Sequence, residues 1–193
     1  MYKTLTQRVD AFQQKYESLA GVVHRAITVD ELIQILMNVF AEKKATHVAT
    51  ADLPDEWLYA LEDQTSQKNI TVYTPPYLRS DLPKQIDDCQ VGVSKVELAV
   101  ADTGCILEFT TRDDTRLIST APDTHIAIVD AKSILGTLPE AAPRMRLFFQ
   151  ENPHEANITT ISGPSRSGDI EMKLTLGVHG PIESHVIIFG EAE

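Results

Sequence analysis

The sequence is poor in cysteine and has no metal-binding spacing. Only two cysteines, Cys89 and Cys105, occur among its 193 residues, and two thiols cannot supply the four thiolates of a usual iron–sulfur cluster. A reducing compartment would also disfavour a disulfide between them. The HExxH, CxxC, GxGxxG and Walker patterns are missing as well. The sequence therefore predicts no metal site and no bound cofactor.

Basic charge is also scarce. Lysine and arginine number 17 against 28 aspartates and glutamates, which gives a formal net charge of -11. A protein that grips nucleic acid or an anionic membrane needs clustered basic side chains. No apolar run approaches the ~18–20 residues of a spanning helix, and the N-terminus lacks the apolar segment of a signal peptide. We therefore expect a cytoplasmic protein with no nucleic-acid partner and no membrane insertion.

What the first part of the chain does have is an alternation of helices and strands. Apolar residues recur every three or four positions over 3–20, which predicts an amphipathic helix. Thr28 and Glu31 have the spacing of a capping box and open a second predicted helix, and Pro54 opens a third. Strands are predicted at 21–24, 46–51 and 70–73. Such alternation is typical of a parallel or mixed sheet with helices on its faces.

The middle of the chain changes character. Two apolar runs, 98–101 and 105–109, flank the turn Asp102-Thr103-Gly104, which predicts a hairpin. A second turn is predicted at 112–114 and a buried strand at 125–129. With no linker and no internal repeat, we predict one α/β domain over 22–193, with the helix of residues 1–21 packed on or beside it.

The stretch 159–189 is the one around which we expect the functional site. A β-branched run at 159–161 leads into a polar loop, acidic residues open a segment ending at Gly177, and an apolar run closes the stretch at 185–189. This order predicts strand, loop, helix, turn and strand, a βαβ unit with an elaborate first loop. Loops at strand ends of such units often bind ligands.

The polar loop predicts an anion-binding site. Its small residues can turn several backbone N–H groups toward one point at a helix N-terminus, and Arg166 could pair with a phosphate or carboxylate. The candidate ligand-binding residues here are Ser162, Gly163, Ser165, Arg166, Ser167 and Asp169. The alternative is a self-capped loop, in which Ser167 caps the helix and Asp169 satisfies its first turn. Both interpretations use the same N–H groups, so the sequence leaves them open.

Three further residues are candidate neighbours of that site. Asp102 and Thr103 could offer a carboxylate and a hydroxyl at a strand end, although an Asx turn is the commoner role of such a pair. His179 could act as a general base, or simply bond the backbone in its turn. No residue is identified as catalytic.

Two motifs carry a resemblance to a known family. Residues 161–171 read ISGPSRSGDIE and residues 177–181 read GVHGP. Followed by His185-Val186-Ile187, they resemble the signature of the lactate utilization protein C family, or LUD domain, whose members typically read ISGPSRTADIE and then GVHGP. Weaker matches occur in the family's order at 91–93, 99–104 and 125–129.

The resemblance implies a fold and a pathway. The fold would be an open mixed sheet with helices on both faces, similar to the sugar-isomerase, CoA-transferase and formyltetrahydrofolate cyclo-ligase group. The pathway would be the bacterial oxidation of L-lactate to pyruvate, beside partner proteins that carry the iron–sulfur clusters. The resemblance implies no catalytic residue.

Three functions therefore stay open. The first is a subunit or accessory protein of an iron–sulfur lactate-oxidising system that binds a small anionic ligand. The second is a stand-alone small-molecule enzyme of the CoA-transferase or cyclo-ligase kind. The third is a non-catalytic interaction module that docks through its N-terminal helix and acidic surface.

Overall fold

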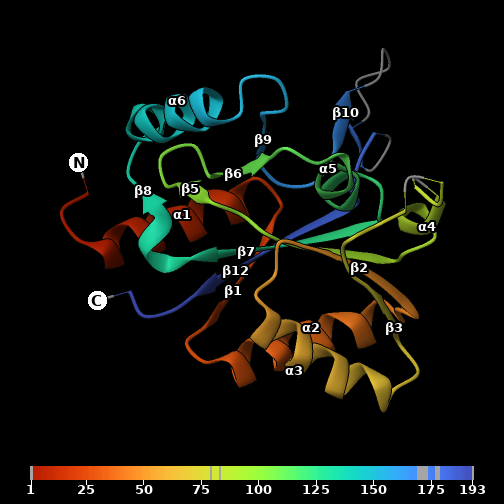
Figure 1. Cartoon of the computed structure of the whole chain (residues 1–193). Helices are drawn as coiled ribbons and strands as arrows, with labels where there is room; N and C mark the ends of the chain where they lie inside the picture. Colours follow the sequence, from red (N-terminus) through yellow and green to blue (C-terminus); the bar gives the residue numbers. More distant parts are fainter. Residues whose placement is uncertain (1, 79, 83, 169–173, 177–178, 193) are drawn as a thin grey trace.

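Six parallel strands form the central sheet of the computed structural model, which describes residues 2–192 except 79, 83, 169–173 and 177–178. The sheet order is β1-β12-β7-β4-β2-β3, and every pairing is parallel (Figure 1). The strands are β1 (Val22–Ala26), β12 (Glu183–Phe189), β7 (Thr124–Asp130), β4 (Val91–Lys95), β2 (His47–Ala51) and β3 (Thr71–Tyr73). A parallel sheet must be covered on both faces, which explains the nearly continuous apolar runs of β7 and β12.

Helices cover both faces of this sheet (Figure 1). On one face, α2 (Val29–Glu42) and α3 (Asp55–Ser66) pack on side chains such as Val93 and Ile126. On the other face lie α1 (Leu5–Ser18) and α5 (Asp113–Thr120), against residues such as Ala127 and Ala51 respectively. The predicted fold class, an open α/β sheet with helices on both faces, is confirmed.

The N-terminal helix α1 is part of the core. Its N-cap Thr4 accepts a hydrogen bond from the Gln7 amide, as the polar start of the helix suggests. Val9, Phe12 and Tyr16 are fully buried, and the Tyr16 hydroxyl lies 2.5 Å from Ser184 Oγ on β12. The apolar stripe of this helix is therefore occupied by contacts within the chain.

A second, four-stranded sheet stands beside the first. Its order is β8-β5-β6-β9, and it is mixed, because β8 is parallel to β5 while β6 is antiparallel to both of its neighbours. The strands are β8 (Ile134–Leu135), β5 (Leu98–Val100), β6 (Cys105–Thr110) and β9 (Asn157–Ile161). Helix α6 (Ala142–Glu151) packs on it through Phe148, which contacts the ring of Phe109. Short helical segments complete the chain: α4 (Lys84–Asp87), η1 (Ala131–Ser133) and η2 (Leu138–Ala141).

Two local predictions are wrong. The turn predicted at 112–114 is the start of α5, whose first-turn acids Asp113 and Asp114 suit a helix N-terminus. The start of the helix predicted after the polar loop, residues 169–173, lies outside the described residues, but residues 174–176 of that predicted helix form the strand β11 (Leu174–Leu176), which pairs antiparallel with β10 (Arg166–Gly168). The alternation Leu174-Thr175-Leu176 has the two-residue period of a strand, which explains that outcome.

The predicted βαβ unit over 159–189 is also wrong. Strand β9 pairs antiparallel with β6 in the small sheet, whereas β12 lies inside the large one. The chain therefore passes from one sheet to the other within this stretch.

No helix in the described part of the chain is long and apolar enough to cross a membrane.

Candidate functional site

The carboxyl ends of β2 and β4 form a topological switch point. After β2 the chain runs to α3 on one face of the sheet, while α5 covers β4 from the other face. Ligands of open parallel sheets bind in the crevice at such a point. Asp52 directly follows β2 and has a positive φ of 58°, a conformation that an aspartate tolerates better than most residues. The residues around Asp52 are therefore candidates for a ligand-binding site.

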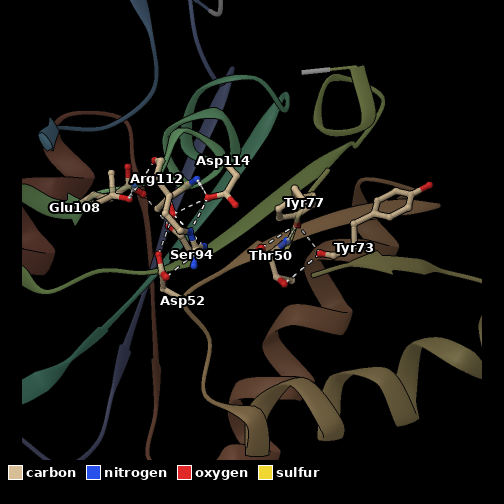
Figure 2. Close-up of polar contacts among 10 residues, drawn as sticks. Thr50, Asp52, Tyr73, Tyr77, Ser94, Glu108, Arg112 and Asp114 are labelled. Atoms are coloured by element: carbon tan, nitrogen blue, oxygen red, sulfur yellow. Dashed lines mark hydrogen bonds and ion pairs between the residues drawn. The ribbon is translucent and has the colours of Figure 1, made fainter. Parts of the chain in front are cut away.

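Arg112 links this crevice to the start of α5. Its Nε donates to Asp114 Oδ1 over 2.9 Å, and its Nη2 lies 3.4 Å from Asp52 Oδ1. Figure 2 shows the guanidinium between these two carboxylates. Thr115 completes the group, because its hydroxyl donates to Asp52 and its amide donates to Asp114. The Arg112 side chain is nevertheless 41% exposed, so part of the guanidinium faces solvent.

A hollow of about 980 Å³ opens beside Arg112. One wall is charged and carries Arg112, Arg116 and Asp113, while another is apolar and carries Tyr77, Leu82 and Leu117. The remaining lining residues are the acid Asp114 and the hydroxyl and amide side chains of Thr111, Thr120, Asn157 and Thr159. This volume lies at the upper end of the usual range for small-molecule sites. We call this space the α5 hollow.

Tyr77 is held in place by its hydroxyl (Figure 2). The oxygen lies 2.7 Å from the Tyr73 carbonyl and 2.9 Å from the Thr50 carbonyl, and it accepts the Thr50 amide over 3.1 Å. Burial raises the pKa of Tyr77 well above its ordinary value, so the phenol stays neutral. Its polar end is thus engaged by the ends of β2 and β3, and its ring remains as a fixed wall of the hollow.

A fully buried carboxyl, Glu108, lies behind the α5 hollow. It sits on β6, directly across the strand pair from Thr159, which lines the hollow. Ser119 on α5 donates to its Oε2 over 2.9 Å, and Ser94 donates to its Oε1 over 3.3 Å. Burial raises the pKa of Glu108 to about 7, despite the two serine hydrogen bonds and with help from the charges of Glu97 and Asp52. Glu108 can therefore hold or release a proton near neutral pH.

His125 extends this buried network. Its Nε2 lies 2.9 Å from Ser94 Oγ, so Ser94 bridges the imidazole and the Glu108 carboxyl. Burial lowers the pKa of His125 to about 4, which keeps the ring neutral at physiological pH. Within the described part of the chain, His125 Nδ1 has no hydrogen-bond partner.

The site residues predicted from the polar loop lie elsewhere, against the end of α1. Gly163 adopts a φ of 89°, and a Cβ built there would stand 2.7 Å from the Leu19 carbonyl oxygen. Its amide bonds the Tyr16 hydroxyl, and the Ser165 amide donates to the Pro181 carbonyl over 2.9 Å. Ser162 and His179 are exposed. Two of the amides expected to hold an anion are thus engaged within the protein.

Asp102 and Thr103 come to the same end of α1. Gly104 lies in the turn between the paired strands β5 and β6. A Cβ built on Gly104 would stand 2.7 Å from Lys15 Cγ, so this turn packs against α1. The Asp102 amide donates to the Gly136 carbonyl, and the Thr103 hydroxyl lies 3.0 Å from Cys105 Sγ. The structure thus brings the predicted turn and the first half of the predicted loop together. It places them apart from the residues of the switch point.

The second half of the loop has a different conformation from the one expected. Arg166 and Ser167 belong to β10, the strand that replaces the expected loop end. Asp169 lies outside the described residues. The proposal that these residues bind an anion stays a prediction.

Comparison with known proteins gives the family. A family model described as the LUD domain matches residues 9–189. The chain belongs to the LUD domain family. The resemblance seen in the sequence is thereby confirmed, and the match includes both the switch point and the ISGPSRSGDIE motif.

Relatives of this LUD domain carry a common name. A "Lactate utilization protein C" from Bacillus subtilis is 34% identical over 56% of this chain and 45% of its own length. One from Geobacillus kaustophilus is 28% identical over 75% of this chain and 58% of its own length. This chain therefore spans about half the length of the curated relatives it matches. A crystal structure of a duf162 family protein from Deinococcus radiodurans has the same fold, with a TM-score of 0.70 over 98% of this chain and 100% of that one, at 19% identity.

The sequence analysis missed Glu108, Arg112 and Asp52. A signal existed for Glu108, because it is a lone charge in the apolar run 105–109, and such a residue is rarely buried without a role or a partner. No such signal marked Arg112, since its neighbours looked like an ordinary polar turn. Asp52 becomes a candidate only through its hydrogen bond from Thr115 on α5, which is 63 residues later in the sequence.

Proposed function

We propose that this LUD protein acts in lactate utilization, as a subunit or accessory protein of an iron–sulfur system that oxidises L-lactate to pyruvate in the cytoplasm. Membership of the LUD family carries the proposal, together with the shared name of its relatives. The matched segment is about half the length of these relatives, so in this proposal the complete activity is not assigned to this chain alone.

Iron–sulfur proteins are the partners that this role requires. Lactate oxidation releases two electrons, and the two cysteines of this chain cannot supply the four thiolates of a usual cluster, so in this proposal a partner accepts the electrons. Cys89 and Cys105 are both buried free cysteines on separate elements, one after α4 and one on β6. In this proposal the clusters therefore lie on other proteins, and this chain supplies binding or positioning.

The α5 hollow is the place that the geometry supports best for the small anionic ligand. It offers two guanidiniums, those of Arg112 and Arg116, whereas the Gly163 and Ser165 amides of the polar loop are engaged elsewhere. Arginine recognises carboxylates and phosphates through paired hydrogen bonds. Arg112 connects the hollow to Asp52 at the switch point, and parallel sheets bind their ligands near such points.

Gene deletion tests the proposed role. A strain without the gene should grow slowly or not at all on L-lactate, and should grow normally on glucose. The wild-type gene should restore growth, and a tagged copy should bring down proteins that contain iron and acid-labile sulfide. Unchanged growth and unchanged lactate oxidation in the deletion strain would defeat the proposal.

The ligand role of Arg166 has a separate test. If its guanidinium forms a charge-assisted bond, Arg166→Ala should weaken binding of L-lactate or pyruvate by about 1.5–3 kcal/mol. Titration calorimetry on the purified chain measures this directly. Equal affinities of the variant and the wild type would remove Arg166 from the site and leave the α5 hollow as the candidate.

A further inference from the structure

The α5 hollow is much larger than the acids of the proposed reaction. A three-carbon hydroxy acid is far smaller than a volume of about 980 Å³. A second hollow of about 330 Å³ adjoins it and shares the residues around the start of α5, among them Arg112 and Arg116. The two guanidiniums therefore stand between two spaces, and a ligand that fills them must extend beyond its anionic group.

The walls define what such an extension would be. Tyr77, Leu82 and Leu117 give an apolar wall, and the Tyr77 ring is fixed because its hydroxyl is bonded to the ends of β2 and β3. A flat aromatic ring gains most from a surface of this kind. Thr159 and Asn157 on β9 add a hydroxyl and an amide to the lining, and these groups can hydrogen-bond a hydroxylated linker.

The charges of the hollow permit an anion. Arg112 is shared between Asp114, at 2.9 Å, and Asp52, at 3.4 Å, but its side chain is 41% exposed, so part of the guanidinium still faces the hollow and the solvent. Asp113 is the exposed partner of Arg116 in a surface ion pair. Exposed pairs of this kind contribute little to stability, so an incoming phosphate can displace Asp113 at small cost.

From these features we infer that the α5 hollow binds a nucleoside phosphate, with the phosphate on Arg112 and Arg116 and the base against Tyr77, Leu82 and Leu117. The inference rests on the ligand site proposed above and adds the chemical class of its ligand. It does not depend on the lactate pathway, because a nucleotide site can be measured on the purified chain alone.

Binding of AMP tests the inference, with adenosine and inorganic phosphate as partial ligands. Titration calorimetry with the full chain should give a dissociation constant for AMP at least tenfold lower than for either partial ligand, because both walls must contribute. Lack of AMP binding at millimolar concentration would overturn the inference. If AMP and phosphate bind with equal affinity, the apolar wall does not contribute and the inference is overturned. If AMP and adenosine bind with equal affinity, the arginines do not contribute and the inference is likewise overturned.

A matched pair of variants locates the site. Arg116→Gln should weaken AMP at least tenfold, the range expected for a lost charge-assisted hydrogen bond. Arg25→Gln is the control, because Arg25 also makes an exposed ion pair, with Asp10, but lies on β1 at the far edge of the sheet. Thermal melts verify that both variants fold. Equal loss in both variants, or no loss in Arg116→Gln, contradicts a site in the α5 hollow. If the deletion strain grows normally on L-lactate while the purified chain binds AMP tightly, only the pathway proposal is defeated.

Discussion

At the scale of single residues, Glu108 is the most informative position in the structure. It is fully buried, and its hydrogen-bond partners among the described residues are the hydroxyls of Ser94 and Ser119. Burial penalises the ionised carboxylate, and the nearby charges of Glu97 and Asp52 add to this, so the pKa rises from 4.5 to about 7. The neutral acid costs less to bury and still accepts the hydrogen bonds from Ser94 and Ser119.

The raised pKa of Glu108 predicts a pH-dependent stability. Between pH 4.5 and 7 the unfolded chain releases this proton while the folded chain keeps it, so stability falls as pH rises through that window. The shift corresponds to roughly 3 kcal/mol at most. Glu108→Gln removes the titration and keeps an amide that can bond both serines. The stability of the wild type relative to this variant should therefore fall by about 2–3 kcal/mol between pH 5 and pH 8.

Urea unfolding of both proteins at the two pH values measures this difference. Titrating groups outside the Glu108 network, such as Glu183, are present in both proteins and cancel in the comparison. A stability difference that is the same at pH 5 and pH 8 would show that Glu108 titrates alike in the folded and unfolded chains.

At the scale of elements, the loop after β9 is fixed by its contact with the end of α1. Gly163 lies so close to the Leu19 carbonyl that no side chain fits, and its φ of 89° is unfavourable for any other residue. The ISGP part of the family motif is thus explained by packing in this chain. Its role as an anion loop stays a prediction.

Gly163→Ala should therefore destabilise the protein by about 2–4 kcal/mol, through steric overlap added to backbone strain. Gly190→Ala is the matched control, because Gly190 has a φ of 97° but no atom within 4 Å of its added Cβ. The control should cost only about 1–2 kcal/mol, the strain alone. Chemical denaturation measures both. Equal losses would mean that the contact with Leu19 is unimportant.

At the scale of the whole molecule, α1 joins the two sheets into one body. It packs on β1 of the large sheet through its buried face, and Gly104 of the small sheet lies against its Lys15. The Tyr16 hydroxyl adds a buried bond to β12. The helix is thus within the folding unit, although the sequence alone allowed it to be an appendage.

Phe12→Ala tests this view of α1. Phe12 is fully buried, so its truncation should cost about 3–5 kcal/mol and lower the midpoint of a single unfolding transition. Phe149→Ala on α6 is the control, since its side chain is 47% exposed and should cost less than about 1 kcal/mol. Circular dichroism and tyrosine fluorescence should follow the same transition. A separate early transition for α1 would show that the helix folds on its own.

The sequence by itself determined the elements that carry a strong local pattern. The capping box of Thr28 and Glu31 is present as expected, the stripe of α1 is buried, and the apolar run at 125–129 is the central strand β7. These features depend on neighbours three or four positions away, or on an unbroken apolar run, so the chain encodes them locally. The family signature is likewise a matter of sequence alone.

Only the tertiary structure decided which sheet each late strand joins and where the site residues meet. Strand β9 finds its partner in β6, about 50 residues earlier in the chain. Asp52, Arg112 and Glu108 are brought together by α5, a helix of eight residues, which is too short to show a helical period. Contacts between distant segments depend on how the two sheets pack, and no local pattern in the chain records that packing.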